Sequence, residues 1–221
     1  MRPKVIIMHI AVKAGEAQKN ELLAKGFSPG VTITWLGKHD VLSSVKADAF
    51  IDLLFDNEFI AASEFIHGKP VFVDAICCTA KQIGYDNYFR INGWGGFLER
   101  PLIEVAAIND AAKAIAEPVL RTLGWKFTWV PDEPGLIAAR IISMIINEAY
   151  FALGDGISTK AEIDTAMKLG TNYPYGPFEW AEKIGLEKIY FLLKKLQQQH
   201  ANRYAVAALL EQEVNNNGII T

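Results

Sequence analysis

Several features that would assign this chain of 221 residues to a class of protein are missing from it. Its only cysteines are Cys77 and Cys78, and sequence neighbours rarely form a disulfide because the geometry strains the peptide between them. They are therefore interpreted as reduced thiols in a reducing compartment. The net charge is −3, so the chain lacks the basic surface that nucleic acids or anionic lipids require. We expect no nucleic-acid partner.

Long hydrophobic runs are also missing. The most apolar stretch, residues 136–146, contains Arg140 and is much shorter than the roughly 20 residues that cross a membrane. The first eight residues have a short apolar run and no small-residue cleavage site, so no signal peptide is predicted. We expect a cytoplasmic protein without membrane contact.

Motifs of common enzyme classes are absent as well. The chain has no P-loop, no HExxH, no GxSxG and no cysteine or histidine spacing suited to zinc. We predict no metal site, and any catalytic role must rest on residues outside these motifs.

What the sequence does contain is a regular alternation of elements over its first two-thirds, typical of a mainly parallel sheet. We predict strands at residues 4–9, 31–36, 49–54, 70–75, 88–94 and 126–130, and helices at 14–25, 57–66 and 111–123. Residues 131–135 (PDEPG) end this region, because two prolines and a glycine stop regular structure. We therefore predict an α/β domain at 1–132 and a helical domain at 133–221.

The helical part shows clear starts and stops. Residues 136–153 are apolar on nearly every side, which indicates either a core helix or a dimer or domain interface. Thr159 and Glu162 form a capping box for the next helix, which Gly170 ends. Pro177 begins a short helix, and two more are predicted at 187–199 and 204–214.

Residues 156–189, GISTKAEIDTAMKLGTNYPYGPFEWAEKIGLEKI, carry a dense set of caps, turns and prolines. The segment resembles the C-terminal helical domain of the 3-hydroxyacyl-CoA dehydrogenases. The matching residues are Ile163, Asp164, Ala166, Met167, Gly170, Tyr173, Pro174, Gly176, Pro177, Phe178, Glu179, Gly185 and Leu186. The resemblance implies a shortened Rossmann-like parallel sheet domain, an all-α domain after it, and a homodimer joined through the helical domain. It also implies NAD-dependent oxidation of an acyl-CoA at its 3-position.

The same resemblance locates the family's catalytic positions. Gly95 replaces the family histidine and Ala139 replaces the family asparagine, whereas Glu104 falls on the glutamate that orients the histidine. Thr79 falls on the family serine position. Its hydroxyl either remains at the site or caps a turn, and we favour the turn.

The glycine-rich turn that binds a dinucleotide is also incomplete. Residues 9–16 (HIAVKAGE) contain one glycine and no GxGxxG, and Glu16 adds negative charge where a pyrophosphate would lie. The remaining candidates for cofactor binding are His9, placed at the end of the first strand, and Asp52 and Asp56, which fall near acidic positions of the family. We expect no cofactor, and NAD only if the family activity is retained.

Three hypotheses about function follow. We favour a non-catalytic relative that binds an acyl-CoA-like metabolite or a partner in an inter-domain cleft, because losing a general base alone costs about 10²- to 10⁴-fold in rate. The first alternative is an active NAD-dependent 3-hydroxyacyl-CoA (3-hydroxybutyryl-CoA) dehydrogenase with a rearranged site that uses Glu104 together with Thr79 or His9. The second is a structural or interaction protein with a closed cleft. Trp94 and its neighbouring glycines either close over a ligand or form a buried turn.

Overall fold

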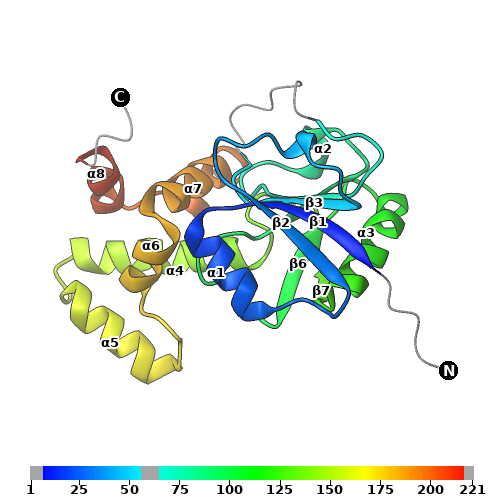
Figure 1. The fold of residues 1–221 in the computed structure, drawn as a ribbon. Helices are drawn as coiled ribbons and strands as arrows, with labels where there is room; N and C mark the ends of the chain where they lie inside the picture. Colours follow the sequence, from blue (N-terminus) through cyan, green and yellow to red (C-terminus); the bar gives the residue numbers. More distant parts are fainter. Residues whose placement is uncertain (1–6, 56–64, 217–221) are drawn as a thin grey trace. The chain divides into compact units, whose positions relative to one another are not determined.

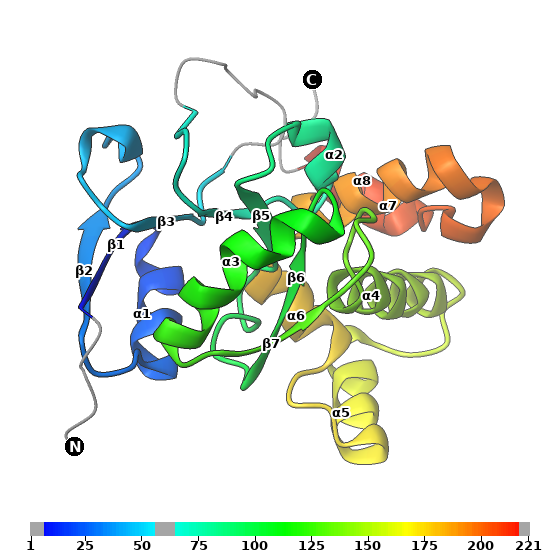
Figure 2. The ribbon, with the colours of Figure 1, turned by 90° about the vertical axis from the view of Figure 1, so that its right-hand side faces the viewer.

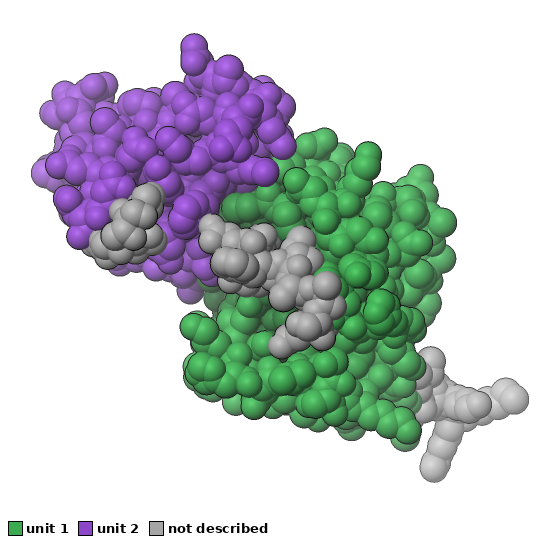
Figure 3. Space-filling model, turned by 90° about the horizontal axis from the view of Figure 1, so that it is seen from above, with its two compact units in different colours: residues 1–136 green, residues 137–221 purple. Residues whose placement is uncertain are grey.

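The computed structural model describes residues 7–55 and 65–216. The chain divides into two compact units, residues 1–136 and 137–221, coloured separately in Figure 3. The first unit is an α/β sheet domain, and the described part of the second, residues 137–216, consists of helices and their connections. Among the described helices, none is long and apolar enough to span a membrane.

The first unit is built on a seven-stranded sheet with the order β2-β1-β3-β4-β5-β6-β7 (Figures 1 and 2). Strands β1 to β5 are parallel, β6 is antiparallel to β5, and β7 is parallel to β6. The strands are β1 (Met8–Lys13), β2 (Val31–Leu36), β3 (Ala49–Asp52), β4 (Val71–Asp74), β5 (Tyr88–Ile91), β6 (Leu102–Ala106) and β7 (Lys126–Trp129). Between them lie α1 (Glu16–Lys25), η1 (Leu42–Ser44), α2 (Ala80–Ile83) and α3 (Asp110–Leu123).

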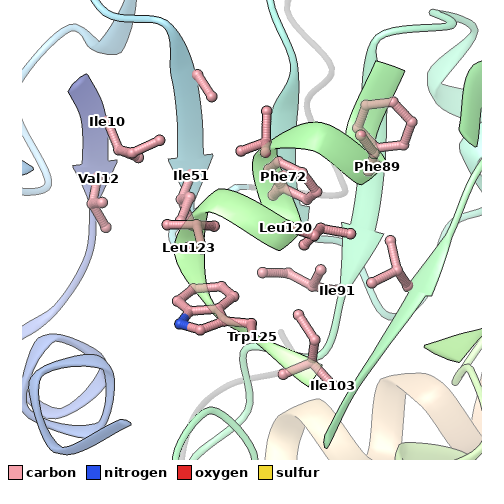
Figure 4. Packing of buried hydrophobic residues seen from close by; sticks show 14 of the residues in the cluster. Ile10, Val12, Ile51, Phe72, Phe89, Ile91, Ile103, Leu120, Leu123 and Trp125 are labelled. Carbon is pink, nitrogen blue, oxygen red and sulfur yellow. The ribbon is translucent and has the colours of Figure 1, made fainter. Parts of the chain in front are cut away.

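Side chains alternate between the two faces of this sheet, as strand geometry requires. One face forms a core with α1 and α3, in which Leu120 and Leu123 of α3 pack over Ile51 and Phe72 (Figure 4). The other face is covered by short segments, including η1 and α2. Within residues 7–55 and 65–216, one face of the sheet therefore carries the two long helices α1 and α3, and the other carries short segments.

All six predicted strands are present, and the structure differs from the prediction in the bounds of the first and in a seventh strand, β6. The first strand is Met8–Lys13 rather than residues 4–9, because its backbone pairs with both β2 and β3 as far as Lys13. β6 was missed, since its short segment is ordered by pairing with β5 and β7 on either side. The predicted helix at 57–66 lies almost entirely outside the described residues.

The second unit contains α4 (Ala138–Gly154), α5 (Lys160–Thr171), α6 (Pro177–Ile184), α7 (Leu186–His200), η3 (Ala201–Tyr204) and α8 (Ala208–Asn216). α4 packs against α6, α7 and α8 and buries Ile142 and Ile146. It is not buried on every side, because Ile141 remains 54% exposed. Asn147 fixes the chain before α8 by bonding the Ala205 carbonyl and the Ala207 N–H at 2.8 and 2.9 Å.

The signature segment, residues 156–189, is held together by helix caps and close contacts between residues near each other in the sequence. Asp164 of α5 is buried and accepts from the N–H groups of Phe178 and Glu179 at 2.8 and 3.2 Å, so it caps α6. The Glu179 carboxylate accepts from the Gly176 N–H at 2.9 Å and pairs with Lys168. The hydrogen bond from Lys168 holds the pKa of Glu179 below its usual value. The matched residues therefore define the α5–α6 junction.

Candidate functional site

An open parallel sheet binds ligands at the carboxyl ends of its strands, at the point where the strand order reverses. In this sheet β1 is that strand, because the chain moves from β1 to β2 on one side and then to β3 on the other. The turn after β1 is tight. The Ala14 N–H bonds the Leu36 carbonyl at 3.0 Å, and the Leu53 N–H bonds the Lys13 carbonyl at 2.8 Å.

The side chain of Gln18 lies against the turn after β1. Its Oε1 accepts from the Gly15 N–H at 3.1 Å, while its Nε2 donates to the carbonyls of Leu53 at 2.9 Å and Gly93 at 3.1 Å. With Gly15 as the middle glycine of a G-x-G-x-x-G fingerprint, Lys13 and Gln18 hold the outer glycine positions. One side chain thus links the N-terminus of α1 to the ends of β3 and β5.

Glu21, one turn further along α1, holds the loop that follows β5. Its two carboxylate oxygens accept from the N–H groups of Gly96 at 2.6 Å and Leu98 at 3.2 Å. Trp94 and Phe97 of this loop are buried, so the loop is a packed turn rather than an open flap. Gly93 is required there, because an added Cβ would lie 2.7 Å from Cγ of Asp74.

Replacing Glu21 by alanine is expected to destabilise the protein by about 1–3 kcal/mol, because two buried N–H groups lose their acceptor. Hydrogen exchange at Gly96 and Leu98 is expected to accelerate, and both changes are measurable by denaturant titration and exchange mass spectrometry. Glu16→Ala on the same helix is the control, since the Glu16 side chain is 85% exposed and should matter little. Equal effects of the two variants would contradict the role of Glu21.

The family's catalytic positions lie in three parts of the structure. Gly95 lies in the turn that connects β5 to the antiparallel β6, and Glu104 lies half-buried on β6. Thr79 caps α2, accepting from the Gln82 N–H at 3.1 Å. Ala139 lies in the first turn of α4 in the helical unit and is fully buried. Gly95 and Glu104 are thus joined by one strand connection.

Of the described candidates for cofactor binding, Asp52 lies beside Lys13 at the turn and His9 does not. His9 is the second residue of β1, so the prediction that it lies at the end of the first strand was wrong. Its ring nitrogens contact the Lys46 carbonyl and Thr34 Oγ1, both at 2.9 Å. Asp52 ends β3 and accepts from the Leu54 N–H at 2.9 Å, whereas Asp56 lies outside the described residues.

A buried ion pair supports the carboxyl end of the sheet. Arg90 of β5 is fully buried and bonds Asp132 Oδ1 at 2.7 Å and the Ala75 carbonyl at 2.7 Å. Asp132 also accepts from the N–H groups of Ala80 and Lys81 at 2.7 and 3.0 Å. The pair therefore ties β5 to the start of α2 and to the segment that ends the first unit.

Sequence reasoning missed Gln18 and Glu21. A glutamine three residues after Gly15 was a visible signal for Gln18, because a side chain at that helix position can accept from the N–H of the residue before the helix. Nothing local marks Glu21, because its partner Gly96 lies 75 residues away in the sequence.

Two cavities lie away from this turn. One, of about 500 Å³ in the sheet unit, is lined by Lys25, Phe27, Glu99 and Trp125 among others. Burial lowers the pKa of Lys25, whose ammonium donates to the Arg100 carbonyl. The other, of about 610 Å³, lies in the helical unit beside Tyr175. Among residues 7–55 and 65–216, no group of three or more His, Cys, Asp or Glu side chains is arranged to hold a metal ion.

Comparison with known proteins gives consistent matches. Residues 135–219 match the C-terminal domain of 3-hydroxyacyl-CoA dehydrogenase. The chain is 42% identical over 112 residues to the 3-hydroxyadipyl-CoA dehydrogenase of Escherichia coli (strain K12), covering 50% of this chain and 24% of that protein. It is 37% identical over 89 residues to the 3-hydroxybutyryl-CoA dehydrogenase of Clostridioides difficile, covering 40% and 32%. The matches thus span about a quarter to a third of these relatives.

A solved structure extends the likeness over the whole fold. The (S)-3-hydroxybutyryl-CoA dehydrogenase PaaH1 from Ralstonia eutropha superposes with a TM-score of 0.69 at 18% identity, covering 96% of this chain and 94% of that chain. At this identity the likeness concerns the fold.

The mostly parallel sheet followed by a helical unit is a Rossmann-like architecture shared with that solved dehydrogenase, which confirms the predicted fold. The matches then identify the family named by the signature of residues 156–189. Residues 135–219 belong to the 3-hydroxyacyl-CoA dehydrogenase family as its C-terminal domain, and the chain is similar to members of that family.

Proposed function

We propose that this chain is a non-catalytic member of its family, which binds an acyl-CoA-like metabolite without NAD-dependent oxidation. The observation that carries the proposal is the position of Gln18. A dinucleotide-binding fold holds the pyrophosphate with free N–H groups at the N-terminus of this helix. The pyrophosphate can come close to the backbone there because the glycines of the turn have no side chains. Here the Gly15 N–H is already bonded to the Gln18 side chain, which also spans the turn. These residues do not fit a dinucleotide.

The loop after β5 supports the same proposal. A histidine at position 95 would act as the base of the family reaction, and the chain has Gly95 there. The described histidines, His9, His39, His67 and His200, lie outside this loop. Glu21 also holds the loop closed against α1. The orienting glutamate, Glu104, therefore has no histidine in this loop to orient.

The class of ligand is supported by the relatives, which are named for 3-hydroxyadipyl-CoA and 3-hydroxybutyryl-CoA. We extend to the chain the family's homodimer through the helical unit as part of the proposal. Leu169 and Ile157 of that unit are 84% and 73% exposed and are available for such a contact.

Titrating NADH against the fluorescence of the five tryptophans is expected to give no saturable quenching. Acetoacetyl-CoA is expected to raise the melting temperature without any oxidation of NADH, because binding to the folded state stabilises it. Saturable quenching together with NADH oxidation would establish the active alternative.

Glu104→Gln separates the outcomes further. If the wild type shows turnover, this variant should lower the rate, because the neutral amide orients a base less well. If the wild type shows no turnover, the variant should leave the rise in melting temperature caused by acetoacetyl-CoA unchanged. Absence of both NADH and acetoacetyl-CoA binding would instead support the structural or interaction protein with a closed cleft. A relative with the family histidine serves as the positive control for the assay.

A further inference from the structure

The sheet of the first unit ends on one side at β2, which has β1 as its sheet neighbour among the described strands (Figure 2). The six residues of β2, VTITWL, include no charged residue and no proline. Natural edge strands usually carry a charge, a proline or a bulge that prevents pairing with another chain. The opposite edge strand, β7, begins with the exposed Lys126. β2 therefore lacks the usual protection of an edge.

The outward backbone groups of β2 follow from its pairing with β1. The carbonyls of Gly30 and Leu36 accept from β1, so alternation points the N–H and C=O groups of Ile33 and Trp35 away from it. The Val31 carbonyl also points outward, while the Val31 N–H bonds the Ser28 carbonyl at 3.2 Å. A regular row of donors and acceptors thus faces the open side.

The side chains at this edge are incompletely covered. Val31, Ile33 and Trp35 pack against the hydrophobic core on the α1 side of the sheet but stay half-exposed. An additional strand beside β2 would cover them and continue that core. The doubly wound fold that binds dinucleotides has one more strand at this place, beyond its second strand.

We propose that β2 pairs antiparallel with β2 of a second copy of this chain, about a two-fold axis at Ile33, so that two sheets join into one. In this register Val31 lies opposite Trp35 and Thr32 lies opposite Thr34, while Ile33 lies opposite itself. Apolar side chains then meet apolar ones, and threonine meets threonine, which are favourable cross-strand pairs. The two Ile33 residues exchange both hydrogen bonds, and each Trp35 N–H donates to a Val31 carbonyl.

The occupant is a second copy because the edge is complementary to itself. An isologous contact requires each residue to meet a compatible partner under the two-fold axis, and the uncharged VTITWL sequence meets that requirement without like charges facing each other. The nearest charge after the strand, Lys38, falls beyond the paired stretch and opposite Ser28. This contact differs from the proposed one through the helical unit and stands independently of any bound ligand.

The test combines assembly mass with hydrogen exchange on the full chain. Sedimentation of the wild type over a micromolar concentration series is expected to show association, beyond the 24.5 kDa of one chain. Exchange at Ile33 and Trp35 is expected to slow as concentration rises. Ile33→Pro removes an outward N–H that β1 does not use, and should weaken the pairing at least about tenfold and halve the mass of the assembly.

Phe127→Pro is the matched control. The Val130 N–H donates to the Val105 carbonyl of β6, and successive N–H groups of a strand point to opposite sides, so the Phe127 N–H points away from β6 at the other edge of the sheet. It should leave the association intact. If Ile33→Pro fails to fold, Ile33→Lys tests the same edge through charge repulsion, and the exchange data on the wild type still decide. The proposal would be overturned if the wild type stays monomeric. It would also be overturned if neither Ile33→Pro nor Ile33→Lys changes the assembly and the protection from hydrogen exchange is confined to α4 or α5.

Discussion

Replacing Arg90 by methionine is expected to lower the free energy of unfolding by about 3–5 kcal/mol. Methionine preserves the apolar length of the side chain but removes the guanidinium that pairs with Asp132 and bonds three backbone carbonyls, those of Ala75, Ile76 and Glu133. The Asp132 carboxylate and these carbonyls would remain without their donor. Urea denaturation followed by tryptophan fluorescence measures the change, which is a large fraction of a typical stability of about 5–15 kcal/mol.

Arg121→Met is the control for this prediction. Arg121 also pairs with a carboxylate, that of Glu117 at 3.2 Å, but its side chain is 72% exposed. Exposed pairs contribute little, so we expect less than about 1 kcal/mol. Similar losses for the two variants, or a loss below about 1 kcal/mol for Arg90→Met, would show that the buried pair is not a support of the sheet unit.

Gly176→Ala is expected to destabilise the helical unit by about 3 kcal/mol, through overpacking and loss of a helix cap. A Cβ at this position would lie 2.3 Å from Cβ and Oδ1 of Asp164, the residue that caps α6. The backbone of Gly176, at φ −72°, is one that alanine adopts readily, so the loss would come from the contact alone. Differential scanning calorimetry of the full chain measures it.

Gly170→Ala is the matched control on the same signature segment. Gly170 lies inside α5 with no atom within 4 Å of an added Cβ, and alanine is the better helix former. We expect a gain of about 0.5–1 kcal/mol. If both substitutions stabilise the protein, the close contact between Gly176 and Asp164 does not limit the packing of the α5–α6 junction.

Elements with a strong local pattern were predictable. β2 was placed at residues 31–36, where β-branched residues dominate. The helix predicted at 111–123 matches α3 within one residue, because Gly124 marks its end. β6 was not predictable, because its short segment carries a half-buried Glu104 and is ordered by β5 and β7. For α4, apolar residues on all sides did not show which side meets a neighbour within the chain, where Ile141 stays exposed, and the interface alternative stays a prediction.

The candidate site divides in the same way. The positions of Gly95, Glu104, Thr79 and Ala139 came from motif matching, and their roles stay predictions. His9 was misplaced because the first strand begins later than its apolar run suggested, an outcome that depends on pairing with β2 and β3.

By itself, the sequence determined the family and the α5–α6 junction, because those caps act between residues close together, such as Asp164 and Phe178, only 14 apart. Only the tertiary structure decided how the turn after β1 is filled. Gln18 reaches Leu53 and Gly93, 35 and 75 residues away, and Glu21 reaches Gly96 across another 75. Such partners are fixed by the strand order of the sheet, which brings the ends of β1, β3 and β5 to one edge.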